Sequence, residues 1–270
     1  MANDLFVELQ EKLEGKKVRI VFPEAYDERV LEAAVKLSAT SYVQPVLVGK
    51  RERVEEIAQP LFLNVSGIEF VDHENYEKYD EMVAKFVERR AGKVTEEKAR
   101  ELLQDVNYFG TMLVYMGEVE GLVSGAIHST GDTVRPALQI IKTKPGVSRT
   151  SGAFIMSRNA SRFIFADCAI NTTIDAQGLA EIAVESAKTA KAFNINPKVA
   201  MLSFSTYGSA KTEETLKVAE ATKLVREKAP TLPVGGEMQF DAAYVPPVAK
   251  LKAPNSEIQG DANVFIFPSL

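Results

Sequence analysis

Residues 121–142 read GLVSGAIHSTGDTVRPALQIIK, and this stretch indicates the fold. Its first four residues, 121–124, form a short apolar run that is typical of a central strand in a parallel sheet. Residues 134–142 have the pattern of a helix, and residues 125–133 between them are mostly small and polar. A strand that runs through a loop into a helix is the repeating unit of α/β proteins.

The same alternation of apolar runs and amphipathic segments continues on both sides of this unit. The other predicted strands are residues 17–22, 45–48, 68–71, 153–156, 162–166, 199–203, 234–238 and 264–267. The other predicted helices are residues 28–40 behind an Asp27 cap, 51–58, 76–90, a segment that begins at Thr95, 175–192, 210–229 and 242–251. Repeated β–α units imply mostly parallel sheets with helices on both faces.

The length of the chain favours two lobes. Its 270 residues exceed what one ordinary compact core accommodates. The clearest turn cluster in the middle of the chain is residues 143–146, TKPG. We therefore expect a first α/β domain over residues 1–145 and a second over residues 146–270. Ligands bind at the carboxyl ends of strands in such sheets, so the strand-to-helix loops are the segments to read for chemistry.

The composition excludes several classes of function. Hydrophobic residues make up 46% and charged residues 26%, as in a folded globular chain, and no apolar run approaches the roughly 20 residues that cross a bilayer. The net charge of −5 argues against nucleic acid as a main partner. The single cysteine, Cys168, excludes an internal disulfide and fits a cytoplasmic location. Two histidines and one cysteine are too few for a zinc site of the usual type, so no metal is expected.

The loop of the opening stretch carries the strongest signal for chemistry. Gly131 lets the backbone approach a ligand, and the amides at a helix start point toward it. Ser129 and Thr130 add hydroxyl groups, and Arg135 follows one turn into the helix, where its guanidinium can fork onto a phosphate. The alternative interpretation is an ordinary capped turn with Asp132 as the N-cap.

A second strand-to-helix loop, residues 203–210, reads SFSTYGSA. Ser203, Ser205 and Thr206 supply hydroxyl groups, and Gly208 permits close backbone approach, so the loop can hold an anion or part of a larger ligand. Such loops are also ordinary helix caps, and this interpretation stays open.

Two further segments have a functional and a structural interpretation. Arg89 and Arg90 close the helix predicted over residues 76–90, where cations are favourable in any case, but one of them can also act as a second phosphate ligand. Cys168 follows a predicted strand, yet no histidine with a suitable spacing activates it as a nucleophile. We therefore expect Cys168 to be a structural residue.

Seven motifs occur in the order in which phosphate acetyltransferases have them. They are PE…D…R (residues 23–29), HSTGDTVRPALQIIKTKPG (128–146), SGAFIM (151–156), FADCAIN (165–171), SFSTYGSA (203–210), GEMQFDAA (236–243) and NVFIFP (263–268). The resemblance covers essentially the whole chain. It implies two α/β/α domains with mostly parallel sheets, related to the isocitrate and isopropylmalate dehydrogenases, with the active site in the interdomain cleft of a homodimer.

The resemblance also implies the chemistry. Such an enzyme transfers an acetyl group between acetyl phosphate and coenzyme A (CoA) by direct attack of the CoA thiol in a ternary complex. CoA is a substrate, and neither a metal nor a cofactor takes part. The second loop, with Ser203, Ser205, Thr206 and Gly208, would then hold an anion or the pantetheine arm of CoA.

The resemblance assigns roles to individual residues. Substrate-binding positions of the family match Arg89, Arg135, Ser129, Thr130 and Gly131. Arg89 and Arg135 would be the arginines that bind the substrate phosphate, with a one-position ambiguity between Arg89 and Arg90. Cys168 matches a cysteine near the site that is not the nucleophile.

One departure from the family pattern concerns the end of the chain. Family members continue beyond the strand predicted at residues 264–267 with a segment that returns to the first domain and carries a Ser-Arg pair and a catalytic Asp. This chain ends at Leu270, so we expect a truncated chain with impaired catalysis.

Three alternatives to an active phosphate acetyltransferase remain open. A phosphate butyryltransferase would use the same chemistry with a longer acyl group. A dehydrogenase of the related fold would need a metal-binding aspartate cluster and a nucleotide loop, and neither is evident in the sequence. A catalytically impaired, CoA-binding module is the third alternative.

Overall fold

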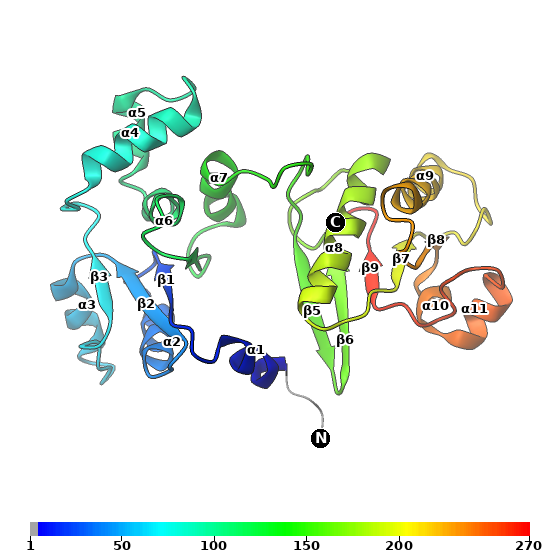
Figure 1. The fold of residues 1–270 in the computed structure, drawn as a ribbon, viewed down its shortest axis with the longest axis horizontal. Coiled ribbons are helices and arrows are strands. Elements are labelled where there is room, and N and C mark those ends of the chain that lie inside the picture. Colours follow the sequence, from blue (N-terminus) through cyan, green and yellow to red (C-terminus); the bar gives the residue numbers. More distant parts are fainter. Residues whose placement is uncertain (1–4) are drawn as a thin grey trace. The chain divides into compact units, whose positions relative to one another are not determined.

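The computed structural model describes residues 5–270, which divide into two compact units (Figure 1). Residues 5–142 form the N-terminal unit and residues 143–270 form the C-terminal unit. Both are α/β structures with parallel strands at their centre. The predicted fold class is therefore confirmed.

The N-terminal unit contains one four-stranded sheet with the order β3-β2-β1-β4, and all of its described pairings are parallel. Its strands are β1 (Val18–Phe22), β2 (Val43–Val48), β3 (Glu69–Val71) and β4 (Gly121–Leu122). Its helices are α1 (Leu5–Leu13), α2 (Glu28–Ser38), α3 (Arg51–Ala58), α4 (Tyr79–Arg90), α5 (Glu96–Leu102), α6 (Val106–Tyr115) and α7 (Thr130–Ile140).

Helices cover both faces of this sheet because successive strand residues point to opposite sides. Val21 of β1 belongs to a core with Phe86 of α4 and Phe109 of α6. Its neighbour Phe22 belongs to a second core with Leu31 of α2 and further residues of α3. The unit thus has three layers, with the carboxyl ends of its parallel strands along one edge of the sheet.

The C-terminal unit contains a five-stranded sheet with the order β5-β6-β9-β7-β8, in which β5 is antiparallel to β6 and the other pairings are parallel. Its strands are β5 (Ala153–Arg158), β6 (Ser161–Ala166), β7 (Val199–Leu202), β8 (Val234–Met238) and β9 (Val264–Ile266). Its helices are α8 (Ala176–Ala192), α9 (Glu213–Lys228), α10 (Phe240–Tyr244) and α11 (Pro246–Lys252). Met201 of β7 packs under α8 and α9, whereas its neighbour Ala200 packs under α10.

The structure corrects some details of the sequence-based expectations. The run at residues 121–124 gives only the two-residue strand β4, at an edge of the four-stranded sheet and not at its centre. Val123 in this run is 56% exposed, which a central strand would not allow. Helix α7 begins at Thr130, earlier than predicted, and Ser129 rather than Asp132 is its N-cap.

Candidate functional site

A buried carboxylate organises the loop that follows β4. Because β1 and β4 are adjacent and parallel, the residues after both strands lie at the same edge of the sheet. Glu24, which follows β1, is 4% exposed. Its Oε2 accepts hydrogen bonds from the amides of Gly125 and Ala126 at 3.0 and 2.8 Å, and its Oε1 accepts from those of Ile127 and His128 at 2.9 and 3.0 Å. The Glu24 carboxylate therefore already accepts hydrogen bonds from these four amides, which could otherwise bind an external anion.

The same carboxylate also holds the ring of His128. Burial would raise the pKa of Glu24, but the hydrogen bonds from Ile127, Ala126 and His128 outweigh it and lower the pKa to about 2. Glu24 is therefore ionised at neutral pH. The Nδ1 atom of His128 lies 2.7 Å from Glu24 Oε1. An ionised carboxylate only accepts, so Nδ1 carries the hydrogen and Nε2 is the nitrogen that is left for another partner.

The lowered pKa of Glu24 predicts a pH-dependent stability. A pKa that falls from 4.5 to about 2 on folding gives stability that is fully present above about pH 4.5 and is lost as the pH falls toward 2. This shift corresponds to a contribution on the order of 3 kcal/mol. We expect the unfolding free energies of the wild type and Glu24→Gln, measured in urea, to differ most at neutral pH and to converge as the pH falls from about 4.5 toward 2. A difference that stays constant down to about pH 3 would contradict this account.

The start of helix α7 lies directly after this loop. Ser129 Oγ accepts from the amide of Asp132 at 3.2 Å and donates to its Oδ2 at 2.6 Å. Arg135 folds back toward the same turn, because its Nη1 lies 3.2 Å from Asp132 Oδ1 and its Nη2 would lie 3.7 Å from a Cβ atom at Gly131. The Arg135 side chain is 57% exposed. The structure thus brings Ser129, Thr130, Gly131 and Arg135 together at a helix N-terminus, an arrangement that suits an anion.

The second predicted loop is also built on a buried carboxylate. Glu237 of β8 accepts from the amide of Gly208 at 2.6 Å and from the hydroxyl of Ser205 at 3.0 Å. Ser205 is completely buried, and the hydroxyl of Thr206, itself 7% exposed, accepts a backbone amide at 3.0 Å. These two hydroxyl groups therefore hold the loop together. Ser203 is only partly buried and Gly208 is exposed, so they are the more accessible members of the set.

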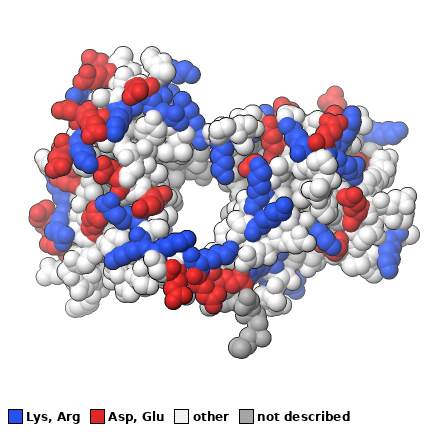
Figure 2. All heavy atoms as spheres, viewed as in Figure 1, with Lys and Arg blue, Asp and Glu red and all other residues white. Residues whose placement is uncertain are grey.

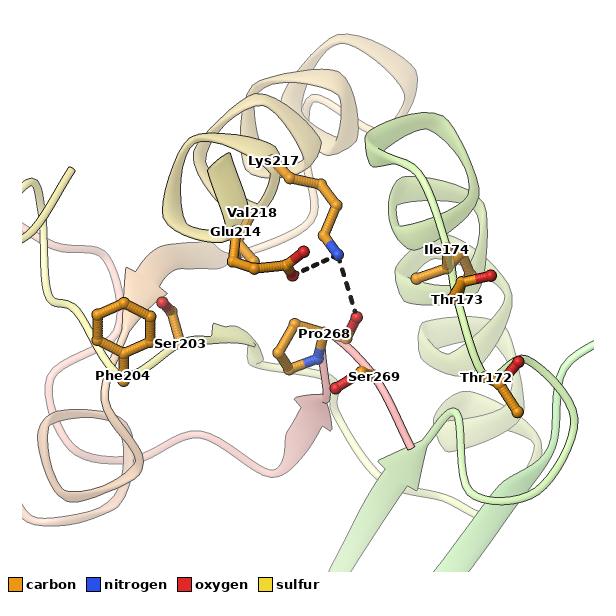
Figure 3. A pocket seen from close by; sticks show the side chains of 10 residues that line it. All are labelled: Thr172, Thr173, Ile174, Ser203, Phe204, Glu214, Lys217, Val218, Pro268 and Ser269. Carbon is orange, nitrogen blue, oxygen red and sulfur yellow. Dashed lines mark hydrogen bonds and ion pairs between the residues drawn. The ribbon is translucent and has the colours of Figure 1, made fainter. Parts of the chain in front are cut away.

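A cavity of about 460 Å³ lies at the carboxyl ends of β7 and β9 in the C-terminal unit (Figure 3). It is lined by Thr172, Thr173, Ile174, Ser203, Phe204, Glu214, Lys217, Val218, Pro268 and Ser269. Lys217 points from α9 toward the segment after β9, with Nζ 2.5 Å from Glu214 Oε2 and 3.5 Å from the carbonyl oxygen of Pro268. Among the predicted site residues, Ser203 lines this cavity.

A third buried carboxylate holds the loop after β6. Asp167 is 7% exposed, and its Oδ1 accepts from the amides of Gly152, Ala169 and Ile170 at 2.9, 3.0 and 3.2 Å. Its Oδ2 accepts from the amide of Asn171 at 2.8 Å. Strand-end loops in both units are thus fixed by a carboxylate whose oxygens are saturated by backbone amides.

The comparisons with known proteins agree with this architecture. The family model described as phosphate acetyl/butaryl transferase matches residues 4–270. The chain belongs to this family. The phosphate acetyltransferase of Bacillus subtilis (strain 168) is 60% identical over 267 residues, which cover 99% of this chain and 83% of the relative. The phosphate acetyltransferase of Staphylococcus aureus (strain Mu50) is 60% identical over 271 residues with the same coverage.

Solved structures support the same assignment. The EutD phosphotransacetylase from Staphylococcus aureus superposes with a TM-score of 0.91 at 60% identity, over 99% of this chain and 82% of that one. A phosphotransacetylase from Streptococcus pyogenes gives a TM-score of 0.94 at 53% identity, over 98% and 82% of the two chains. A branched-chain phosphotransacylase from Enterococcus faecalis, at 16% identity and a TM-score of 0.61, shares the fold. The function is accordingly that of a phosphate acetyltransferase, an acyltransferase.

The two arginines at the end of α4 contact the opposite end of α7 from Ser129. Arg89 donates to the carbonyl oxygens of Ile140 and Ile141 at 2.5 and 2.8 Å, and Arg90 donates to a neighbouring carbonyl at 3.2 Å. At a rise of about 1.5 Å per residue, Ile140 lies about 14 Å along the helix from its first turn. Arg89 therefore caps the C-terminal end of α7 in this structure, away from the first turn, which Ser129 caps. Its role as a phosphate ligand in this transferase family member stays a prediction.

Cys168 is poorly suited to nucleophilic attack. Burial, followed by the charge of the adjacent Asp167, raises the pKa of its thiol. A raised pKa lowers the thiolate fraction, and the thiolate is the reactive form. We expect Cys168→Ala to retain most of the turnover and the wild type to form no acetylated Cys168. Mass spectrometry of the enzyme quenched during turnover checks this, and a trapped acetyl-Cys168 would contradict it.

None of the three carboxylates that organise these loops is among the site residues predicted from the sequence. Glu24 lies more than 100 positions before the amides that it accepts, and Glu237 lies 29 positions after Gly208. The sequence does contain a signal for such carboxylates, namely an acidic residue at the end of a buried strand or directly after it. Such a residue lies beside the strand-end loops, whose backbone amides need hydrogen-bond acceptors.

The surface carries charges of both signs. On the face in Figure 2, basic and acidic side chains occur on each unit. Among residues 5–270, no helix is long and apolar enough to cross a membrane.

Proposed function

We propose that this chain transfers the acetyl group between acetyl phosphate and CoA by direct attack in a ternary complex. The CoA sulfur forms a bond to the acetyl carbonyl carbon while the bond from that carbon to the phosphate oxygen breaks. The thiol proton passes, directly or through water, to the departing phosphate oxygen, and inorganic phosphate leaves. The identity of 60% over 99% of the chain to a phosphate acetyltransferase carries this proposal.

The phosphate group would bind at the start of helix α7. The amides of Thr130 and Gly131 lie in the first turn, where helix N–H groups have no partner within the helix. The guanidinium of Arg135 beside them neutralises the charge that develops on the leaving phosphate. Ser129 fixes this turn as its N-cap. The accessible Ser203 and Gly208, in the second loop, are proposed to contact CoA, and Ser205 and Thr206 to shape that loop.

A thioester assay tests the activity. The chain is mixed with acetyl phosphate and CoA, and acetyl-CoA is followed by its absorbance and by mass spectrometry. We expect acetyl-CoA to form and phosphate to be released in equal amounts. The absence of any thioester from folded protein would overturn the proposal.

The acyl preference is a separate question with its own measurement. We propose that acetyl phosphate is preferred, since the relatives that are 60% identical are named phosphate acetyltransferases. Rates with acetyl, propionyl and butyryl phosphate are compared at equal concentrations. A higher kcat/KM for butyryl phosphate would favour the butyryltransferase alternative.

We propose that the chain works as a homodimer in the cytoplasm. The resemblance to phosphate acetyltransferases supports the dimer, and the single, free Cys168 fits a reducing compartment. Light scattering coupled to gel filtration gives the mass in solution. A mass of about 30 kDa, that of one 29.6 kDa chain, would contradict the dimer.

A further inference from the structure

We propose that Glu24 is a positioning residue of the phosphate site, which acts through the backbone of residues 125–128 and the ring of His128. This inference rests on the proposed acetyl transfer and extends it by one residue. Glu24 itself makes no contact with substrate in this account, because both of its oxygens are occupied by protein donors.

The geometry of the loop carries the inference. Four successive amides that converge on one point attract any anion, including a substrate phosphate. Glu24 supplies a permanent anion there and is buried, so phosphate is excluded from these amides. The amides that follow along the chain are those of Ser129, the N-cap, and of Thr130 and Gly131 in the first turn of α7, beside Arg135. Glu24 thus directs the phosphate to the helix start and keeps it from the preceding loop.

His128 connects the carboxylate to the site. Its backbone amide and its ring Nδ1 both bond to Glu24 Oε1, at 3.0 and 2.7 Å, so the residue is fixed by one backbone and one ring contact with the same atom. The residue that follows it is Ser129, the N-cap of α7. With Nδ1 engaged, only the Nε2 edge of the ring is available to a substrate, and the side chain retains 23% exposure. Loss of the carboxylate would free both the ring and the residue before the cap.

A merely structural role and a positioning role differ in their kinetics. A structural residue lowers the folded fraction or the melting temperature and leaves the KM of the folded protein unchanged. We expect Glu24→Gln to raise the KM for acetyl phosphate by about tenfold, because a carboxamide cannot accept all of these hydrogen bonds. The KM for CoA should change by less than about twofold, because CoA is assigned to other residues. Glu24→Asp, which keeps the charge, should recover part of the loss.

Thr95→Ala is the matched control for stability. Thr95 caps α5 in the same unit, with its side chain accepting from the amide of Lys98 at 3.2 Å, and it lies outside the proposed site. We expect this variant to lower the melting temperature without changing either KM. If Glu24→Gln behaves as Thr95→Ala does, the inference is overturned.

Two measurements decide the inference if Glu24→Gln does not fold or if the wild type shows no turnover. His128→Phe leaves the four amide bonds intact and removes only the ring contact, and it should weaken binding of inorganic phosphate severalfold in an NMR titration. In the wild type, ¹⁵N-labelled histidine should show the hydrogen of His128 on Nδ1. A hydrogen on Nε2 with none on Nδ1, or unchanged phosphate binding in His128→Phe, would contradict the proposal. If the wild type passes both NMR tests but shows no turnover, the proposed acetyl transfer is contradicted and the positioning role of Glu24 is not.

Discussion

Arg135→Ala is expected to lower kcat/KM for acetyl phosphate by at least tenfold. The guanidinium lies beside the first turn of α7, with Nη2 3.7 Å from the Cβ position of Gly131. A charge-assisted hydrogen bond to a phosphate oxygen contributes roughly 1.5–3 kcal/mol, which corresponds to a factor of about ten to one hundred. Steady-state kinetics with acetyl phosphate as the varied substrate measure the loss.

Two further variants test whether the fall in kcat/KM is specific to Arg135 or follows from the loss of any positive charge in the N-terminal unit. Arg135→Lys keeps the positive charge but not the planar fork, so its activity should lie between those of the wild type and Arg135→Ala. Arg100→Ala removes another partly exposed arginine of the same unit, which pairs with Asp80 and Glu96 at 2.8 and 2.9 Å. Exposed pairs of this kind contribute little, so Arg100→Ala should retain full activity. Equal kinetics of Arg135→Ala and Arg100→Ala would remove Arg135 from the site.

Asp167→Ala is expected to lower the free energy of unfolding more than the removal of a single helix cap does. The substitution leaves the amides of Gly152, Ala169, Ile170 and Asn171 without their acceptor in a partly buried loop. Each unsatisfied buried group costs about 1–3 kcal/mol, and water will compensate some of them, so we expect a loss of about 3 kcal/mol or more.

Urea denaturation of Asp167→Ala and a control in the same unit tests this expectation. Asp175 is the N-cap of α8 and accepts one amide, from Gly178 at 2.8 Å. Removal of a single cap costs about 1 kcal/mol, so Asp175→Ala should be clearly more stable than Asp167→Ala. Equal losses would mean that the carboxylate of Asp167 does not organise its loop.

The sequence predicted most elements of the fold because their periodicity is clear. Strand β7 is a short apolar run, β1 is apolar except for Arg19, and the long helices α8 and α9 have one apolar face. Helix α6 was not predicted. Seven of its residues are buried, so it lacks the polar face that marks an amphipathic helix. The edge position of β4 was missed because four apolar residues do not reveal which neighbours a strand has.

The candidate site was predictable only where its residues are adjacent in sequence. The grouping of Ser129, Gly131 and Arg135 follows from helical spacing. The contacts of Glu24 cross about a hundred residues and depend on which strands are neighbours, which local patterns do not encode. For the same reason the bond between the Ser205 hydroxyl and the buried Glu237, 32 positions later, is not visible in the sequence, and the role of Ser205 toward substrate stays a prediction.

The claim that phosphate binds at the start of α7 is tested most directly by NMR titration of the ¹⁵N-labelled chain with inorganic phosphate. We predict that the amide signals of Thr130 and Gly131 and the side-chain Nε signal of Arg135 shift together with one dissociation constant. The amides of residues 125–128, which already donate to Glu24, should shift much less. Shifts centred on residues 125–128, or none at Thr130 and Gly131 at saturating phosphate, would contradict the account.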